Sequence, residues 1–270
     1  ERCLIQGTAG TGKTLMALEL LKREVKEGDE VALFCFNNQL GERLSALSKN
    51  ITDSNAKVKF CGTLHSYMSQ YCESIKPSSL DQLNKYFTED LPIEFLITNE
   101  YLPEGEKLDY LILDEAQDLL TPYYLEVFDL ILKGGIKNGK WVMFGDFSNQ
   151  AIYLNKPEES ILRLNSYATF TTFPPLKINC RNTKEIATHN TLMTGARVPE
   201  FTSKNYLGNQ VICKYPSKSS RISVILEILL KIESRKIPLE KVTLLSPKKF
   251  ENSIISEDTQ IRGFIDNGVL

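Results

Sequence analysis

Strand-like apolar runs alternate with amphipathic stretches along most of the chain. The strand-like runs are residues 3–5, 31–36, 57–61, 110–113 and 141–144. The stretches that mix leucines with charged or polar residues at helical spacing begin after residues 14 and 65 and span 39–47 and 122–132. Short apolar runs of this kind are typical of strands buried on both faces of a sheet. Their alternation with helices predicts an α/β fold with a doubly wound parallel sheet.

Two places interrupt this alternation. Residues 70–107 contain three prolines among mixed polar and aromatic positions, which predicts a small, mostly helical insertion. Pro174-Pro175 marks a domain boundary, so we expect a first domain over residues 1–172 and part of a second over 173–270. Within the second part the pattern predicts strands at 176–179 and 242–246 and helices from Thr183 to His189 and at 220–232.

A glycine-rich segment follows the first predicted strand and opens the first predicted helix. It reads Gly7-Thr8-Ala9-Gly10-Thr11-Gly12-Lys13-Thr14 and fits the phosphate-loop pattern at every fixed position. Glycines let the backbone N–H groups wrap an anion at a helix N-terminus. We expect residues 7–14 to bind the phosphates of ATP, with Lys13 on the β- and γ-phosphates and the Thr14 hydroxyl on Mg²⁺. The alternative is a glycine-rich turn that binds nothing.

An acidic pair follows the predicted strand at 110–113. Parallel α/β sheets place their ligands at the carboxyl ends of the strands, which is where Asp114 and Glu115 would lie. Asp114 is the expected Mg²⁺ ligand, and Glu115 is the expected general base that orients the attacking water. A solvated acidic turn is the alternative, and the phosphate loop upstream favours the catalytic interpretation.

Composition is compatible with a globular protein of one large or two modest domains. The chain has 270 residues, of which 42% are hydrophobic, and its net charge is −2. No apolar run reaches the roughly 20 residues of a membrane span, and no signal peptide precedes the phosphate loop. Six scattered cysteines are read as reduced thiols, so we expect a cytoplasmic protein without membrane partners. The charge balance gives nucleic-acid binding no support beyond a possible local basic groove.

Four segments occur in an order that resembles superfamily 1 helicases of the UvrD/Rep branch, including those fused to nuclease-related domains. The segments are residues 7–14, 114–118 (Asp-Glu-Ala-Gln-Asp), 145–150 (Gly-Asp-Phe-Ser-Asn-Gln) and 176–182 (Leu-Lys-Ile-Asn-Cys-Arg-Asn). The resemblance covers most of residues 1–190 and continues more weakly to about 247. It implies a RecA-like ATPase domain followed by part of a second RecA-like domain.

The resemblance also implies roles for single residues. Gln150 matches the family's glutamine that senses the γ-phosphate, and Arg181 matches the arginine that reaches the γ-phosphate across the interdomain cleft. A planar cation there would stabilise the transferring phosphoryl group. A surface turn at Gln150 and a helix-start ion pair at Arg181 are the alternatives.

Nucleic-acid contacts are implied for loops that follow the strands. The matching positions are Phe36, Asn37, Thr63, His65 and Tyr153. Small polar groups can hold phosphate and an aromatic ring can stack on a base. Phe36 as a core residue and His65 as a helix-cap neighbour are equally compatible with the sequence. Asn155 and Lys156 stand where the family has tryptophan and arginine, which argues against base stacking beside Tyr153.

The family's adenine-reading glutamine precedes the phosphate loop, and its fifth and sixth motifs follow the region of residues 245–247. Neither is present in these 270 residues, so we expect a fragment of a longer motor with little activity alone. The resemblance implies an ATP-dependent helicase or translocase on single-stranded DNA or tailed duplex, in repair, recombination or defence. An ATP-gated switch controlling an attached nuclease or protein partner is the alternative. A small-molecule kinase would leave residues 114–118 and Gln150 unexplained.

Overall fold

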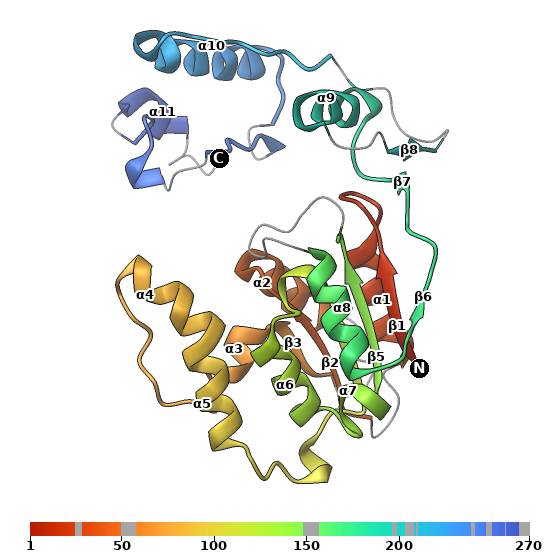
Figure 1. The fold of residues 1–270 in the computed structure, drawn as a ribbon. Helices are drawn as coiled ribbons and strands as arrows, with labels where there is room; N and C mark the ends of the chain where they lie inside the picture. Colours follow the sequence, from red (N-terminus) through yellow and green to blue (C-terminus); the bar gives the residue numbers. More distant parts are fainter. Residues whose placement is uncertain are drawn as a thin grey trace. The chain divides into compact units, whose positions relative to one another are not determined.

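A computed structural model describes residues 1–24, 29–49, 58–147, 157–195, 199–202, 208, 210–238, 241–246, 250–256 and 258–264. The chain divides into two compact units, Glu1–Gln210 and Val211–Leu270. The first contains a parallel six-stranded sheet in the order β3-β2-β4-β5-β1-β6 (Figure 1). The strands are β1 Arg2–Gln6, β2 Val31–Cys35, β3 Val58–Thr63, β4 Tyr110–Leu113, β5 Lys140–Gly145 and β6 Thr171–Thr172. The predicted parallel α/β sheet is confirmed, and it is compatible with a RecA-like fold.

Helices cover both faces of this sheet, because successive strand residues point to opposite sides. On β4, Tyr110 and Ile112 pack against α1 (Lys13–Glu24) and α2 (Asn38–Ser48). Leu111 and Leu113 pack on the other face, against α3 (Leu64–Met68), α5 (Leu91–Thr98), α6 (Pro122–Ile131) and α8 (Pro157–Tyr167). The short helix α7 (Gly135–Asn138) lies on this second side through Ile136.

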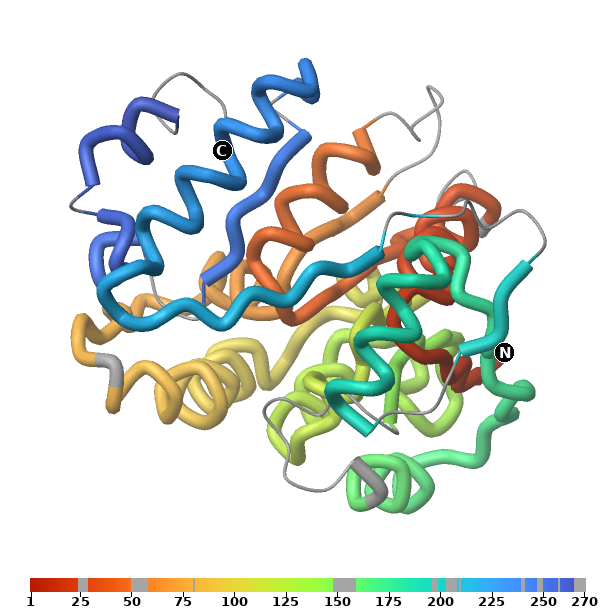
Figure 2. Tube along the Cα trace, turned by 90° about the horizontal axis from the view of Figure 1, so that it is seen from above, coloured from red at the N-terminus to blue at the C-terminus, as the bar shows by residue number. Residues whose placement is uncertain are grey.

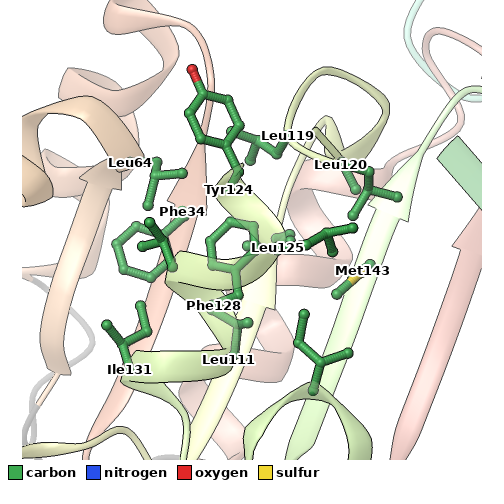
Figure 3. Close-up of a cluster of buried hydrophobic side chains, with 14 of the residues drawn as sticks. Phe34, Leu64, Leu111, Leu119, Leu120, Tyr124, Leu125, Phe128, Ile131 and Met143 are labelled. Atoms are coloured by element: carbon green, nitrogen blue, oxygen red, sulfur yellow. The ribbon is translucent and has the colours of Figure 1, made fainter. Parts of the chain in front are cut away.

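The larger of the two cores centres on α6. Thr121 caps this helix by accepting a hydrogen bond from the Tyr124 N–H, and Pro122 occupies its first turn. Leu125, Phe128 and Ile131 recur on one side of the helix and are fully buried. Figure 3 shows them among side chains of β2, β4 and β5, with Phe34 and Met143 beside them. This core packs α6 against the central strands β2, β4 and β5.

The segment between β3 and β4 is mostly helical, as its composition predicts. It contains α4 (Leu80–Lys85), a π-helical turn (Tyr86–Asp90), α5 and a 3₁₀ turn (Glu104–Glu106). Both views place α4 and α5 to one side of the sheet, where α5 contacts α3 and α6 (Figure 1, Figure 2).

Beyond β6 the first unit continues with three further elements. They are β7 (Ile178–Asn179), α9 (Lys184–Thr194) and β8 (Glu200–Phe201), and β7 pairs with β8 in parallel. Leu176 forms a bridge to Gly7, so the predicted strand at 176–179 runs beside the phosphate loop before it reaches β7.

The second unit contains α10 (Arg221–Ser234) and α11 (Thr259–Phe264), with 3₁₀ turns at Lys218–Ser220 and Phe250–Asn252. The strand predicted at 242–246 is wrong. These residues are not a strand, because the described part of this unit offers no strand to pair with, and Leu244 packs instead against the small apolar cluster around Leu229 of α10. A second RecA-like domain over residues 173–270 therefore stays a prediction.

Across the part of the chain that the structure describes, no helix has both the length and the apolar character needed to cross a membrane. No two of the cysteines form a disulfide there.

Candidate functional site

The glycine-rich loop lies between β1 and α1, at the carboxyl edge of the sheet. The Gly7 N–H donates to the Gly145 carbonyl at the end of β5 (3.0 Å), which joins the loop to the neighbouring strand. Gly10 and Gly12 have φ angles of +82° and +91°, in the left-handed region that side-chain-bearing residues rarely adopt. The sequence thus forms the turn that a phosphate-binding backbone requires, at the start of α1.

Lys13 is the first residue of α1, and its side chain folds back over the loop. Its Nζ donates to the carbonyl oxygens of Gly7 (2.8 Å) and Thr8 (3.3 Å). Thr8 Oγ1 is buried and has no hydrogen-bond partner within the described ranges. A buried, unpartnered hydroxyl beside a buried ammonium group fits a loop that binds an anion.

Thr14 and Asp114 are in direct contact, although one hundred residues separate them in the sequence. Thr14 Oγ1 donates to Asp114 Oδ2 (2.6 Å). A hydroxyl and a carboxylate are the hard oxygen ligands that Mg²⁺ takes, so the donor set fits this ion. Among the described residues no group of three or more His, Cys, Asp or Glu side chains could hold a metal by itself. An ion held by Thr14 and Asp114 would complete its coordination with phosphate oxygens and water.

Asp114 is fully buried at the end of β4. Its Oδ1 accepts the Glu115 N–H (3.1 Å), and its own N–H donates to the Phe34 carbonyl (2.8 Å). Burial raises the pKa of Asp114 from 3.8 to about 6, since a carboxylate loses its hydration there. The Thr14 hydroxyl lowers this pKa in part, and the charge of Glu115 raises it again. A divalent cation at this position would favour the ionised form.

Glu115 has a left-handed backbone (φ 54°, ψ 45°), which is unusual for a residue with a side chain. This conformation starts the 3₁₀ turn Ala116–Asp118 and leaves Glu115 partly exposed while Asp114 is buried. Strained backbone conformations of this kind cluster at functional sites. The Glu115 carboxylate accepts a hydrogen bond from Gln117 Nε2 (2.8 Å).

The segment before α9 packs against the phosphate loop. The Leu176 N–H donates to the Gln6 carbonyl (2.7 Å) and the Cys180 N–H to the Gly10 carbonyl (2.8 Å). The buried side chain of Asn179 accepts the N–H groups of Arg181 (3.0 Å) and Asn182 (2.9 Å). Its Nδ2 donates to the Ala9 carbonyl (3.4 Å). Arg181 is therefore fixed by its backbone next to the loop, with an exposed side chain.

Two of the residues predicted to contact nucleic acid cap helices. Asn37 Oδ1 accepts the Leu40 N–H at the start of α2 (3.2 Å). Thr63 is buried, and its Oγ1 accepts the Ser66 N–H at the start of α3 (3.1 Å). Helix starts of this kind present N–H groups at the edge of the sheet, so nucleic-acid binding by Asn37 and Thr63 stays a prediction.

His65 and Phe36 belong to a group of aromatic side chains. The two ring centroids are 5.3 Å apart, and the Phe87 ring lies 4.7 Å from His65. His65 Nε2 is hydrogen-bonded to Tyr124 Oη (2.7 Å), and this hydroxyl also donates to the Phe87 carbonyl (2.8 Å). Burial, together with the charge of Lys76, lowers the pKa of His65 from 6.5 to about 4. Both predicted contacts are thus partly buried, and their role toward nucleic acid stays a prediction.

Gln150 and Tyr153 lie outside the described residues, as do Asn155 and Lys156. The structure brings Lys13, Thr14, Asp114 and Glu115 together at one edge of the sheet. Gln117 and Asn179 were not among the predicted site residues. Both residues lie inside the helicase-like segments 114–118 and 176–182, and this was the only indication in the sequence that they belong to the site.

Comparison with known proteins identifies the family through one family model. No curated protein matches the chain. The family model of the Schlafen group 3 DNA/RNA helicase domain matches residues 1–151, which is more than half of the chain and includes β1 to β5 together with Lys13, Thr14, Asp114 and Glu115. This match supports a helicase-related family and does not specify the UvrD/Rep branch. The chain belongs to the Schlafen group 3 DNA/RNA helicase domain family.

Proposed function

We propose that this chain carries the ATP-hydrolysing part of a nucleic-acid motor, a DNA helicase or single-stranded-DNA translocase related in mechanism to the UvrD/Rep branch. The observation that supports this most directly is the contact between Thr14 and Asp114 beside the buried Lys13 ammonium group. Three side chains from two distant segments meet where a nucleotide triphosphate and Mg²⁺ are held in proteins of this design. Family membership supports a nucleic-acid partner.

Each residue has a separate task in this proposal. The N–H groups of residues 7–12 and the start of α1 bind the phosphates. Lys13 leaves the Gly7 and Thr8 carbonyls and pairs with the β- and γ-phosphates. Thr14 and Asp114 would hold Mg²⁺, which would neutralise charge on the phosphates. Arg181 and Gln150 complete the site in this proposal by contacting the γ-phosphate.

Glu115 acts on the attacking water. Its carboxylate orients the water and takes a proton from it while the water oxygen bonds to the γ-phosphorus and the bond to the β-phosphate oxygen breaks. ADP and phosphate are the products. The partial exposure of Glu115 allows water to reach it, whereas the buried Asp114 carboxylate faces Thr14.

The test is the rate of ATP hydrolysis by the full-length protein, with and without single-stranded DNA or RNA, beside Lys13→Ala. Stimulation by nucleic acid that disappears in the variant supports the motor, and the preferred polymer separates DNA from RNA. ATP binding without any stimulation would contradict the motor and favour an ATP-gated switch acting on an attached nuclease or protein partner. Salt-sensitive binding to the polymer is a second expected result.

A further inference from the structure

Gln117 makes three hydrogen bonds through its side-chain amide. Nε2 donates to Glu115 Oε2 (2.8 Å) and to Asp118 Oδ2 (3.3 Å), and Oε1 accepts the Asp146 N–H (3.0 Å). Both donors of the amide and its oxygen are therefore in use. Only 2% of the Gln117 surface is exposed, so water does not compete for these bonds.

The orientation of this amide follows from its partners. Two carboxylates lie on the Nε2 side, and a backbone N–H lies on the Oε1 side. A reversed amide would place its oxygen against the carboxylates and its N–H groups against the Asp146 N–H, leaving every bond repulsive. The bond to Glu115 is thus a donation to a charged acceptor, which is stronger than one between neutral groups.

The same amide connects two strands. Glu115 follows β4, whereas Asp146 follows β5, and the two residues are separated by thirty positions of sequence that include α6 and α7. Through Gln117, the Glu115 carboxylate is therefore linked to the backbone directly after β5. The chain runs on from there to Gln150, the residue expected to sense the γ-phosphate.

We propose that Gln117 is the positioning residue for Glu115. Gln117 holds the Glu115 carboxylate in the orientation that activates water, and it ties that orientation to the backbone of Asp146, directly after β5. This inference rests on the proposed function, because it assigns Gln117 a role in the same hydrolysis. A general base that points away by about 1 Å loses on the order of 100-fold in rate. Nucleotide affinity depends on the phosphate loop and should change little.

Two substitutions distinguish a role of Gln117 in positioning Glu115 from a role in stabilising the fold. Gln117→Glu keeps an oxygen that can accept the Asp146 N–H but turns the donor toward Glu115 into a repelling carboxylate. Gln117→Ala removes all three side-chain hydrogen bonds. Gln82→Glu, on the exposed surface of α4, makes the same change of charge away from the site and serves as the matched control.

The experiment measures kcat for ATP and the Kd of a fluorescent ATP analogue on the full-length protein. Amide hydrogen exchange over residues 145–147 and thermal unfolding of each variant accompany them. We expect both Gln117 variants to lose about 10- to 100-fold in kcat with Kd changed less than about threefold. Exchange should accelerate in Gln117→Ala and stay slow in Gln117→Glu, while Gln82→Glu matches the wild type throughout.

A wild-type protein that hydrolyses ATP, beside a Gln117→Glu variant with kcat within about twofold of it, would overturn the positioning role and leave the proposed function standing. A wild-type protein that binds nucleotide without turning it over would overturn both. If Gln117→Ala fails to fold, the kcat and Kd of Gln117→Glu alone test the positioning role. A parallel loss of kcat, Kd and thermal stability in Gln117→Glu would show a merely structural role and also overturn the proposal.

Discussion

Two groups of side chains lie at the carboxyl ends of the parallel strands, and they are built in opposite ways. The phosphate-side group, Lys13, Thr14, Asp114 and Glu115, places charged atoms in a largely buried setting. The aromatic group, Phe36, His65, Phe87 and Tyr124, surrounds a neutral histidine with rings and bonds its Nε2 to the Tyr124 hydroxyl. Burying charge costs stability, whereas packing rings adds to it. Substitutions in the first group should therefore change activity, and those in the second should change stability.

The largest expected effect is on activity, in the phosphate-side group. Lys13→Ala removes the cation that would pair with the phosphates, so hydrolysis should fall by at least about 100-fold. The melting temperature should move by a few degrees at most, since the loop carbonyls can bond to water. Lys22→Ala, on an exposed position of the same helix, is the control and should leave both quantities unchanged. A Lys13→Ala protein that hydrolyses ATP at nearly the wild-type rate would show that the phosphate-side group does not determine activity.

The next effect concerns pH and the aromatic group. The pKa of His65 is about 4 in the folded protein and 6.5 when exposed, so the unfolded chain binds the extra proton first as the pH falls. Stability from this residue is complete above pH 6.5 and is lost toward pH 4, amounting to about 3 kcal/mol. Asp114 has the opposite pH dependence over part of this range, because its raised pKa of about 6 adds stability as the pH falls, so the His65 contribution appears as a difference between proteins. Urea unfolding at several pH values should show His65→Gln losing about 3 kcal/mol less stability than the wild type between pH 6.5 and pH 4, with His189→Gln equal to the wild type. Equal pH dependence in all three proteins would contradict it.

A smaller effect should go in the opposite direction, toward higher stability. Asp114→Asn removes a carboxylate whose pKa burial has raised to about 6, so at pH 7 the folded state no longer holds that buried charge. We expect a gain of about 1 to 2 kcal/mol in the free energy of unfolding, reduced by the amide group that then faces the Glu115 N–H. Mg²⁺-dependent nucleotide binding should weaken at the same time. An Asp114→Asn protein that is less stable than the wild type would show that the phosphate-side group, like the aromatic group, contributes to stability.

The smallest expected effect tests the polar atoms of the aromatic group. Tyr124→Phe removes the hydroxyl that bonds to His65 Nε2 and to the Phe87 carbonyl, and it keeps the ring. Leaving partly buried groups without a partner should lower stability by about 1 kcal/mol. Tyr123→Phe, at the neighbouring position, is the control, and chemical denaturation measures both. A variant as stable as the wild type would mean that ring packing alone holds His65.

Local patterns in the sequence predicted the sheet well because its central strands are short apolar runs, as at residues 110–113, bounded by recognisable turns. The phosphate loop and the acidic pair were predicted for the same reason, since their chemistry lies in consecutive residues. The error at 242–246 has the opposite cause. An apolar run can also pack against a helix, as Leu244 does, and only a neighbouring strand decides between the two.

Contacts between distant residues account for the rest. His65 was equally compatible with a ligand and a capping neighbour, because Tyr124, which fixes its ring, lies 59 positions away. The role of Gln117 depends on a backbone N–H at Asp146. Local hydrophobic periodicity predicts neither the His65–Tyr124 contact nor the Gln117–Asp146 contact. The sequence therefore identifies candidate reacting groups, and the structure adds the residues that contact them, such as Gln117 beside Glu115.

The strand order has a consequence for how the protein is made. β1 lies between β5 and β6, so the strand that leads into the phosphate loop finds its partners only when residues 140–145 and 171–172 exist. During translation at about 5–20 residues per second, β1 waits on the order of ten seconds after its own synthesis. β2, β3 and β4 can pair with one another meanwhile. The glycine-rich loop at residues 7–14 therefore reaches its final position late in synthesis, after β5 and β6 have been made.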